Sequence, residues 1–256
     1  MQRERIDKLL VDRGLARSRT RAQALVMAGV VLVDEQLVSK PSDFFPHNAN
    51  IRIKGAGDPA ARYVGRGALK LEAALREFQV EVTDLTCLDV GASTGGFTDC
   101  LLQHDARKVV AIDVGHNQFD WRLRTDPRVE LREGVNARYL KPEDFDDKFD
   151  LVAIDVSFIS LTKILPAIAP LLKDRGRLIA LIKPQFEVGK GEVGKGGIVT
   201  ETAKHQQVVQ QINHAAKEFG LEVCGLIESP IRGAEGNREF LAMYELAIST
   251  TKTRRH

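Results

Sequence analysis

The chain has 256 residues, 43% of them hydrophobic and 28% charged, which is an ordinary globular composition. No segment is long and uncharged enough for a membrane helix, and the charged start "MQRERIDKLL" is not expected to act as a signal peptide. The three cysteines are widely spaced without a metal-binding pattern, so we expect a cytoplasmic protein with no metal and no membrane partner. The net charge is only +2, so any basic surface must be local.

The excess of positive charge is concentrated in the first part of the chain. Residues 1–54 hold ten Lys or Arg against six acids, a net charge of +4. Apolar residues at helical spacing predict a helix that ends at Gly14, and Ser18 is a suitable N-cap for a second helix that stops at Gly29. "VVLVD" and "ANIRIK" then predict strands. We expect a small α+β domain over residues 1–58.

The rest of the chain alternates between strand and helix patterns. Five apolar stretches predict strands: "TCLDVG", "KVVAIDV", "VELREG", "FDLVAIDV" and "GRLIALIK". Helical stretches separate several of them, which predicts a Rossmann-like α/β fold with a mostly parallel sheet and ligands at the carboxyl ends of its strands. A helix is predicted between Thr200 and Phe219, and the two strands after it should pair antiparallel at a sheet edge. We expect a linker over residues 59–66 and this larger domain over 67–256.

A glycine-rich loop, "LDVGASTGG", follows the first of these strands and precedes a helix. Glycines there let a ligand approach the backbone closely, and a nucleotide is the usual ligand. The dinucleotide pattern G-x-G-x-x-G fits poorly because position 93 is Ser. The form D-x-G-x-S-x-G resembles instead the first motif of S-adenosylmethionine-dependent methyltransferases, and Asp113 at the next strand end could accept hydrogen bonds from a ribose. The predicted cofactor-binding residues are Asp89, Gly91, Ala92, Ser93, Gly95, Gly96, Phe97, Asp113, Val114, Asn136 and Asp155.

A second glycine-rich stretch, "EVGKGEVGKGG", is close to a phosphate-binding P-loop. Gly189 to Lys195 matches G-x-x-x-x-G-K, but the next residue is Gly196, where a Ser or Thr should hold Mg²⁺. We interpret the stretch over residues 186–200 as a mobile basic loop, either a lid, an RNA contact or simply a solvated loop.

Polar residues at the other strand ends bear on which group would receive a methyl. The turn "IDVSFIS" lacks the N/D-P-P-Y sequence common for base amino groups, and no cysteine follows the fourth or fifth strand to act as the nucleophile for carbon methylation. Asp155 and Lys183 follow those strands, and Lys70 and Glu239 can converge on the same edge. A hydroxyl needs its proton accepted, and a lysine desolvated beside another cation can have its pKa lowered enough to help. The set therefore suits a hydroxyl acceptor.

These segments together resemble one family. "YVGRGALKLEAAL", "CLDVGASTGGFTD", "AIDVSFIS", "LIKPQFE" and "GNREFL" are similar to the TlyA family, often labelled haemolysin A, whose members are FtsJ-like ribosomal-RNA 2′-O-ribose methyltransferases. The resemblance covers nearly the whole chain. It implies S-adenosylmethionine as cofactor, cytidines of ribosomal RNA in either subunit as substrate, and a catalytic tetrad of Lys70, Asp155, Lys183 and Glu239.

The N-terminal part resembles the RNA-binding fold of ribosomal protein S-four, which this family carries. Arg19 and Arg21 lie in the first turn of a predicted helix, where the helix dipole disfavours cations. Bound phosphates would offset that cost. The residues expected to bind RNA are Arg5, Lys8, Arg17, Arg19, Arg21, Arg62 and Arg66.

Two other functions remain open at this level. A non-catalytic RNA-binding or ribosome-assembly factor could keep the fold, although the complete tetrad argues against it. A membrane-damaging haemolysin is suggested by the family label, but the sequence shows no membrane segment for it.

Overall fold

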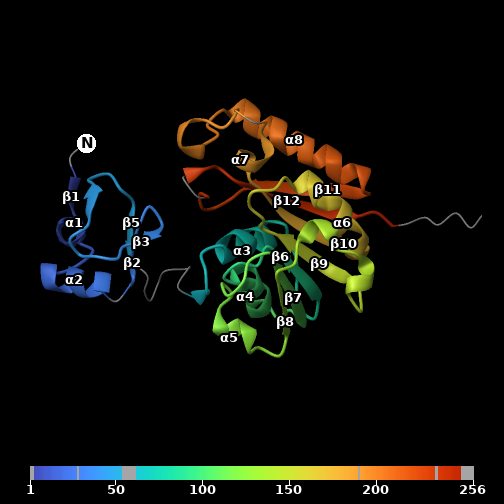
Figure 1. Ribbon diagram of the computed structural model, residues 1–256, viewed down its shortest axis with the longest axis horizontal. Helices are drawn as coiled ribbons and strands as arrows, with labels where there is room; N and C mark the ends of the chain where they lie inside the picture. Colours follow the sequence, from blue (N-terminus) through green and yellow to red (C-terminus); the bar gives the residue numbers. More distant parts are fainter. Residues whose placement is uncertain (1–2, 28, 54–61, 190, 234–235, 249–256) are drawn as a thin grey trace, which may run out of the picture. The chain divides into compact units, whose positions relative to one another are not determined.

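The computed structural model describes residues 3–27, 29–53, 62–189, 191–233 and 236–248. They form two compact units, divided between Arg62 and Tyr63 (Figure 1). The boundary falls within the linker expected over residues 59–66, of which residues 59–61 lie outside the described part of the chain.

The first unit is a small α+β fold. The apolar stripe on α1 packs against apolar residues of α2 and of the central strand β2, and together they form the core of this unit. Ser18 caps α2 as predicted, since its Oγ accepts a hydrogen bond from the backbone N–H of Arg21 at 3.2 Å. Strands β3, β2 and β5 form an antiparallel sheet in that order, and β1 pairs with β4. The elements are β1 (Arg3–Arg5), α1 (Ile6–Asp12), α2 (Arg19–Met27), β2 (Val31–Val33), β3 (Gln36–Leu37), β4 (Phe44–Pro46) and β5 (Ile51–Ile53).

The second unit is built on a seven-stranded sheet with the order β11-β12-β10-β9-β6-β7-β8. Strand β12 runs antiparallel to both neighbours, and β6, β7, β8, β9 and β10 are parallel to one another. The predicted α/β class, with a mostly parallel sheet whose last strand is antiparallel, is confirmed. The strands are β6 (Thr86–Val90), β7 (Lys108–Asp113), β8 (Val129–Glu133), β9 (Phe149–Ile154), β10 (Leu172–Ile182), β11 (Leu221–Glu228) and β12 (Phe240–Leu246).

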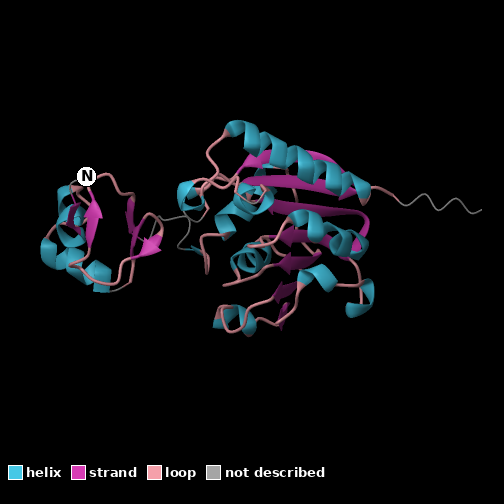
Figure 2. Cartoon of the chain, turned by 45° about the horizontal axis from the view of Figure 1, so that its top comes forward, coloured by secondary structure: helices cyan, strands magenta, loops and turns pink. Residues whose placement is uncertain are grey.

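Helices cover both faces of this sheet (Figure 2). Successive residues of a strand point to opposite faces, so in β6 the side chain of Leu88 packs with α6 and α8, and that of Cys87 packs with α3 and α4. The helices are α3 (Ala68–Glu77), α4 (Gly96–Gln103), α5 (Trp121–Arg124), α6 (Leu165–Ile168), α7 (Pro184–Glu187) and α8 (Thr202–Glu218). Short 3₁₀ turns are η2 (Ala137–Tyr139), η3 (Pro142–Asp144), η4 (Leu161–Lys163), η5 (Ala169–Leu171) and η6 (Lys195–Gly197).

The strand order places a switch point beside β6. The chain passes from β6 to β7 on one side, and β9 later pairs with the other side of β6. The carboxyl ends of these three strands therefore meet at one edge, where the connections diverge and leave room for a ligand.

Two further findings concern possible ligands and membranes. Among the described residues, no helix combines the length and apolar character that crossing a membrane requires. In the same part of the chain, no group of three or more His, Cys, Asp or Glu side chains is arranged to hold a metal ion.

Candidate active site

The glycine-rich loop after β6 is held against the ends of two other strands. The backbone N–H groups of Gly91 and Ala92 both donate to the carbonyl of Ile112 in β7, at 2.9 and 3.0 Å. Gly91 has φ +86°, and a Cβ at this position would lie 2.5 Å from the carbonyl oxygen of Asp155. Glycine is therefore required here both by the left-handed backbone and by the close approach of the segment after β9.

A cavity of about 420 Å³ opens beside this loop. Its lining includes the predicted cofactor residues Gly91, Ser93, Asp113, Val114, Asn136 and Asp155. The carboxylate of Asp113 accepts the backbone N–H of Ser93 at 2.7 Å on one oxygen and that of Gly115 at 2.6 Å on the other. Each oxygen keeps a further lone pair, so Asp113 could still accept hydrogen bonds from a ribose.

Two predicted cofactor residues, Asp89 and Gly95, line neither this cavity nor the one described next. The Asp89 carboxylate is fully buried, and its Oδ2 accepts a hydrogen bond from the Thr98 hydroxyl at 2.7 Å. Burial raises the pKa of Asp89 to about 7, and the nearby charge of Asp155 adds to the shift. Gly95 caps α4 with φ +95°, and a Cβ there would strike the side chain of Leu123. Direct contact of either residue with a cofactor stays a prediction.

A second cavity, of about 280 Å³, shares Gly91, Ser93, Asp155 and Ser157 with the first. Its lining also includes Lys70 and Lys183, as well as the loop residues Ala92, Gly96 and Phe97. Two lysine–carboxylate contacts are formed here: Nζ of Lys183 lies 2.6 Å from Oδ1 of Asp155, and Nζ of Lys70 lies 2.6 Å from Oε2 of Glu239. Lys70, Lys183 and Glu239 are all buried. The structure thus brings the four predicted catalytic residues together.

Four separate elements position these side chains. Lys70 lies on α3, Asp155 and Lys183 follow β9 and β10, and Glu239 precedes β12. Because β12 is antiparallel, its amino end lies at the same sheet edge as the carboxyl ends of β9 and β10. The pairing of Ile182 with Phe240 sets Lys183 and Glu239 next to each other just beyond the paired residues.

Comparison with known proteins identifies the family of this chain. Residues 63–245 match the FtsJ-like methyltransferase family, and residues 4–51 match the S4 domain. The chain belongs to the FtsJ-like methyltransferase family. The family predicted from the sequence is therefore confirmed. The prediction that the protein is an enzyme of the methyltransferase class is confirmed as well.

Three relatives of this FtsJ-like methyltransferase match over most of their length. The 16S/23S rRNA (cytidine-2′-O)-methyltransferase TlyA of Mycobacterium tuberculosis is 44% identical over 93% of this chain and 88% of its own. Hemolysin A of Brachyspira hyodysenteriae is 41% identical over 94% of this chain and 99% of its own. A solved structure from Streptococcus thermophilus, provisionally named a hemolysin, is 45% identical with a TM-score of 0.75, and the match covers 96% of this chain and 90% of that one.

Three residues of the FtsJ-like domain that contact the tetrad were not predicted as site residues from the sequence. The Ser157 hydroxyl accepts a hydrogen bond from Nζ of Lys183 at 2.9 Å. The Gln185 amide nitrogen lies 3.4 Å from Oε1 of Glu239, and Gly233 packs directly against the Glu239 carboxylate. Ser157 and Gln185 lie inside the segments "AIDVSFIS" and "LIKPQFE", but nothing in those segments distinguishes a hydroxyl or amide that faces the site from one that faces solvent.

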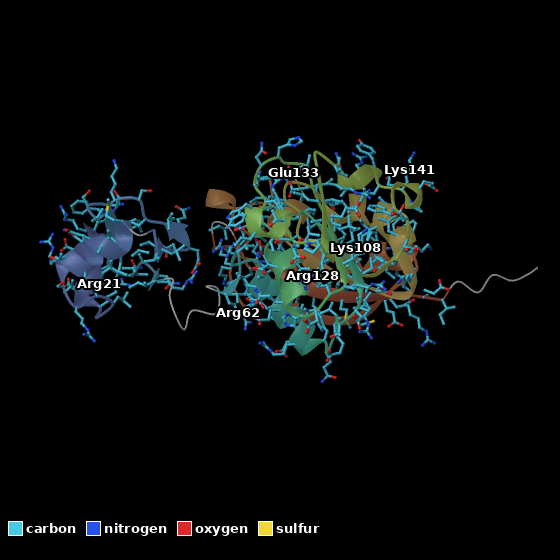
Figure 3. The ribbon with its side chains drawn as sticks, turned by 90° about the horizontal axis from the view of Figure 1, so that it is seen from below. Arg21, Arg62, Lys108, Arg128, Glu133 and Lys141 are labelled. Carbon is cyan, nitrogen blue, oxygen red and sulfur yellow. The ribbon has the colours of Figure 1, made fainter. Side chains whose placement is uncertain are left out.

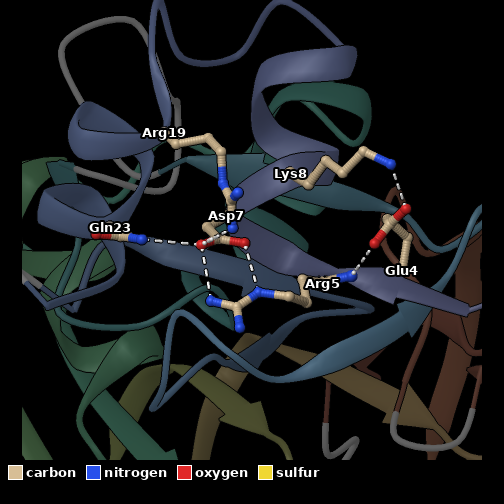
Figure 4. A network of polar contacts seen from close by, with 6 residues as sticks. All are labelled: Glu4, Arg5, Asp7, Lys8, Arg19 and Gln23. Carbon is tan, nitrogen blue, oxygen red and sulfur yellow. Dashed lines mark hydrogen bonds and ion pairs between the residues drawn. The ribbon is translucent and has the colours of Figure 1, made fainter.

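The S4 domain contains a buried carboxylate that organises its basic residues (Figure 4). Asp7 is fully buried and accepts hydrogen bonds from Arg5 at 3.0 and 3.1 Å, from Arg19 at 3.1 Å and from Gln23 at 2.9 Å. The Arg5 guanidinium, together with Gln23 and Arg19, holds the pKa of Asp7 well below its usual range. The cost of placing Arg19 at the start of α2 is thus already offset within the domain, without a bound phosphate.

The other predicted RNA-binding residues differ in how they are engaged. Lys8 is paired with Glu4 at 2.5 Å. Arg17 and Arg21 are exposed and form no ion pair with any other described residue. Arg62, like Arg21, is exposed at the surface (Figure 3), and Arg66 lines the 280 Å³ cavity that also contains Lys70 and Lys183.

A charged cavity of about 530 Å³ lies at the opposite edge of the sheet, at the amino ends of the parallel strands. Lys108 and Arg128 line it (Figure 3), but Lys108 is paired with Glu130 at 2.6 Å and Arg128 with Asp126 at 2.8 Å. Its charges are compensated internally, and parallel α/β sheets bind ligands at the other edge, so we do not assign the active site here.

The glycine- and lysine-rich stretch over residues 186–200 is anchored at its far end. The buried Asn237 accepts the backbone N–H of Val199 at 3.0 Å and donates to the carbonyl of Gly197 at 2.9 Å. Lys190 and the side chain of Lys195 lie outside the described part of the chain. The predicted lid or RNA contact therefore stays a prediction.

Proposed function

We propose that this FtsJ-like methyltransferase transfers a methyl group from S-adenosylmethionine to the 2′-hydroxyl of a cytidine ribose in ribosomal RNA. The observation that carries the proposal is the pair of lysine–carboxylate contacts, Lys183 with Asp155 and Lys70 with Glu239, at a cavity that adjoins the one beside the glycine-rich loop. The name of the Mycobacterium tuberculosis relative, a cytidine-2′-O enzyme, supports the same acceptor.

The residues of the larger cavity fit S-adenosylmethionine. When bound, this cofactor supplies an electrophilic methyl group on its sulfonium. Gly91 lines this cavity, and its lack of a side chain lets the loop lie directly against the segment after β9. Asp113 offers carboxylate oxygens for ribose hydroxyls, and the exposed Val114 offers apolar surface for the adenine. The volume is also in the range of about 300–1,000 Å³ that is usual for ligand sites.

The smaller cavity supplies what a hydroxyl acceptor needs. Lys183 would accept the proton of the 2′-hydroxyl, and Asp155, whose Oδ1 lies 2.6 Å from Nζ of Lys183, is its ion-pair partner at the cavity. Lys70, held by Glu239, places a second positive charge at the same cavity, where it would stabilise the oxygen as negative charge develops. Burial of both amines limits the water that could compete for these contacts.

The S4 domain would supply affinity for the RNA backbone. Arg17 and Arg21 carry charge that is not compensated within the described residues, so each is available for a phosphate. Arg5, Lys8 and Arg19 already have carboxylate partners, so their contribution to phosphate binding requires sharing those partners. The proposed partners are thus ribosomal RNA or ribosomal subunits in the cytoplasm.

Methyl transfer to ribosomal subunits tests the proposal directly. Subunits from cells that lack this protein are incubated with it and with isotope-labelled S-adenosylmethionine, and 2′-O-methyl positions are then mapped along the RNA. The expected result is label on a ribose at cytidine that is absent with Lys183→Ala.

Each alternative predicts a different outcome of the same experiment. RNA binding without any transfer would indicate an assembly factor. Label on a base would contradict the hydroxyl acceptor. Lysis of erythrocytes by the purified protein, unchanged in Lys183→Ala and without transfer to RNA, would indicate a haemolysin.

A further inference from the structure

Ser157 lies at the junction of the two cavities. It follows Asp155 by two residues in the segment after β9, and it contributes to the lining of both cavities. Its Oγ accepts a hydrogen bond from Nζ of Lys183 at 2.9 Å. It is thus the hydroxyl in contact with the lysine to which the proposed function assigns proton transfer.

The hydrogen bond to Ser157 gives the amine of Lys183 a defined orientation. A lysine nitrogen is tetrahedral, and its three positions beyond Cε hold three hydrogens when charged, or two hydrogens and a lone pair when neutral. Ser157 Oγ accepts a hydrogen bond from one of these positions at 2.9 Å. Asp155 Oδ1 lies 2.6 Å from the nitrogen as its ion-pair partner, but not in the direction of a hydrogen bond. With only the ion pair to Asp155, which lacks this direction, the amine could rotate about the Cε–Nζ bond. The hydrogen bond to Ser157 stops this rotation and so sets where the other positions of the nitrogen point in the cavity that Lys183 lines.

The segment that carries Ser157 is also held by contacts to α7, the helix that follows Lys183. The buried carboxylate of Glu187 in α7 accepts the Ser160 hydroxyl at 2.5 Å and the backbone N–H of Leu161 at 2.8 Å. Phe158 has φ +64°, which is rare for a bulky residue, and its ring lies 5.0 Å from that of Phe186. Unusual backbone conformations of this kind are kept where surrounding contacts enforce them, and they cluster at functional sites. The hydroxyl of Ser157 is therefore preorganised.

We propose that Ser157 is a positioning residue, whose hydroxyl orients the amine of Lys183 toward the acceptor hydroxyl. The inference rests on the proposed function, because it takes Lys183 as the group that accepts the proton. It adds a residue that acts through Lys183 and does not itself exchange a proton with the substrate.

The first test compares three variants in methyl transfer to ribosomal subunits. Ser157→Ala should lower kcat about tenfold or more, because small misplacements of a reacting group cost that much, with the KM for RNA and the affinity for S-adenosylmethionine within about twofold of wild type. Ser157→Thr keeps the hydroxyl and should retain most of the rate. Ser160→Ala is the matched control, since it removes a hydroxyl from the same segment that contacts Glu187 and lines neither cavity.

The kinetic outcomes are distinct. Wild-type kcat in Ser157→Ala, a loss confined to cofactor affinity, or equal losses in Ser157→Thr and Ser157→Ala would each overturn the proposal. An equal kcat loss in Ser160→Ala would also overturn it, because the effect would then come from loosening of the segment.

The second test needs no activity and separates this inference from the proposed function. The full chain is labelled with a lysine-selective acylating reagent, and the rate at Lys183 is followed by mass spectrometry, with Lys173 as an internal reference because it contacts Asp150 away from the site. Ser157→Ala should speed labelling of Lys183 about 2- to 10-fold, as expected for loss of one hydrogen bond, and Ser157→Thr should restore the slow rate. Unchanged labelling would overturn the positioning role, whereas faster labelling without any methyl transfer by wild type would overturn only the proposed function.

Discussion

Gly233 lies directly against the carboxylate of Glu239. A Cβ built on Gly233 would stand 2.5 Å from Cδ of Glu239 and closer still to Oε1. Glu239 in turn holds Lys70 at 2.6 Å, so a glycine outside the tetrad limits where two of its members can sit.

Gly233→Ala should therefore displace Glu239 from Lys70. We expect the methyl-transfer rate to fall about tenfold or more, with the affinity for S-adenosylmethionine nearly unchanged, because the clash is with a buried side chain that cannot move away freely. Gly189→Ala is a suitable control, since its Cβ would meet only the flexible end of Glu192. Single-turnover methylation checks the effect, and a Gly233→Ala protein with full activity would show that Glu239 can relocate without cost.

Lys183→Arg separates two roles for the lysine. Arginine keeps the positive charge but effectively never loses a proton. If Lys183 accepts the proton, Lys183→Arg should be nearly as inactive as Lys183→Ala, a loss of about 10²–10⁴-fold, with the cofactor still bound. The pH profile is read beside it, because steric misfit of arginine could also lower the rate. Substantial single-turnover activity in Lys183→Arg would exclude Lys183 as the obligatory base.

The ion pairs of the S4 domain define which arginines can be tested cleanly for RNA binding. The double variant Arg17→Ala with Arg21→Ala should weaken RNA binding. The slope of the logarithm of the binding constant against the logarithm of the salt concentration should also become shallower, by about 0.7–0.9 for each phosphate that is no longer neutralised. Arg19 is left intact because it bonds Asp7. The double variant Lys148→Ala with Lys217→Ala removes the same charge from exposed positions of the other unit and serves as control. An unaltered salt slope in the arginine variant would place the RNA-binding surface elsewhere.

Asp7 should make the S4 domain acid-sensitive. Its pKa in the folded chain is held below the ordinary value of 3.8, so its contribution to stability is present above that value and is lost as the pH falls toward the folded-state pKa. Asp7→Asn should lower the free energy of unfolding by about 1–3 kcal/mol at neutral pH. This difference from wild type should become smaller below about pH 4. Urea unfolding followed by circular dichroism between pH 7 and 2.5 measures this. A difference in unfolding free energy that stays constant over this pH range would contradict the assigned ion pairs.

The cofactor cavity is better tested at Asp113 than at Gly95. Gly95→Val would force a side chain into Leu123 at a left-handed position, so it should destabilise the fold and report little on binding. Asp113→Ala should weaken S-adenosylmethionine binding about tenfold or more, the loss expected for hydrogen bonds to a charged group. Calorimetry on the folded variant checks this, and unchanged affinity would remove Asp113 from the site.

The local sequence determined much of this protein. Short apolar stretches identified the strands of the large sheet. Ser18, Gly29 and Gly220 marked helix ends, because capping and left-handed turns depend on a few adjacent residues. The glycine-rich loop and Asp113 also predicted a nucleotide site, because each is recognised from a short local pattern. The very short strands β1, β3 and β4 went unpredicted, since two or three residues are too few to show a period.

Only the tertiary structure decided which side chains meet. Lys70 and Glu239 are 169 residues apart in the chain, and their contact depends on the register that pairs Ile182 with Phe240 in antiparallel strands. A slip of one residue in that register would turn the side chains of β12 to the opposite face of the sheet. The fit of Gly233 against Glu239, like the hydrogen bonds of Arg19 to Asp7, depends on distances between elements that no local pattern in the sequence encodes.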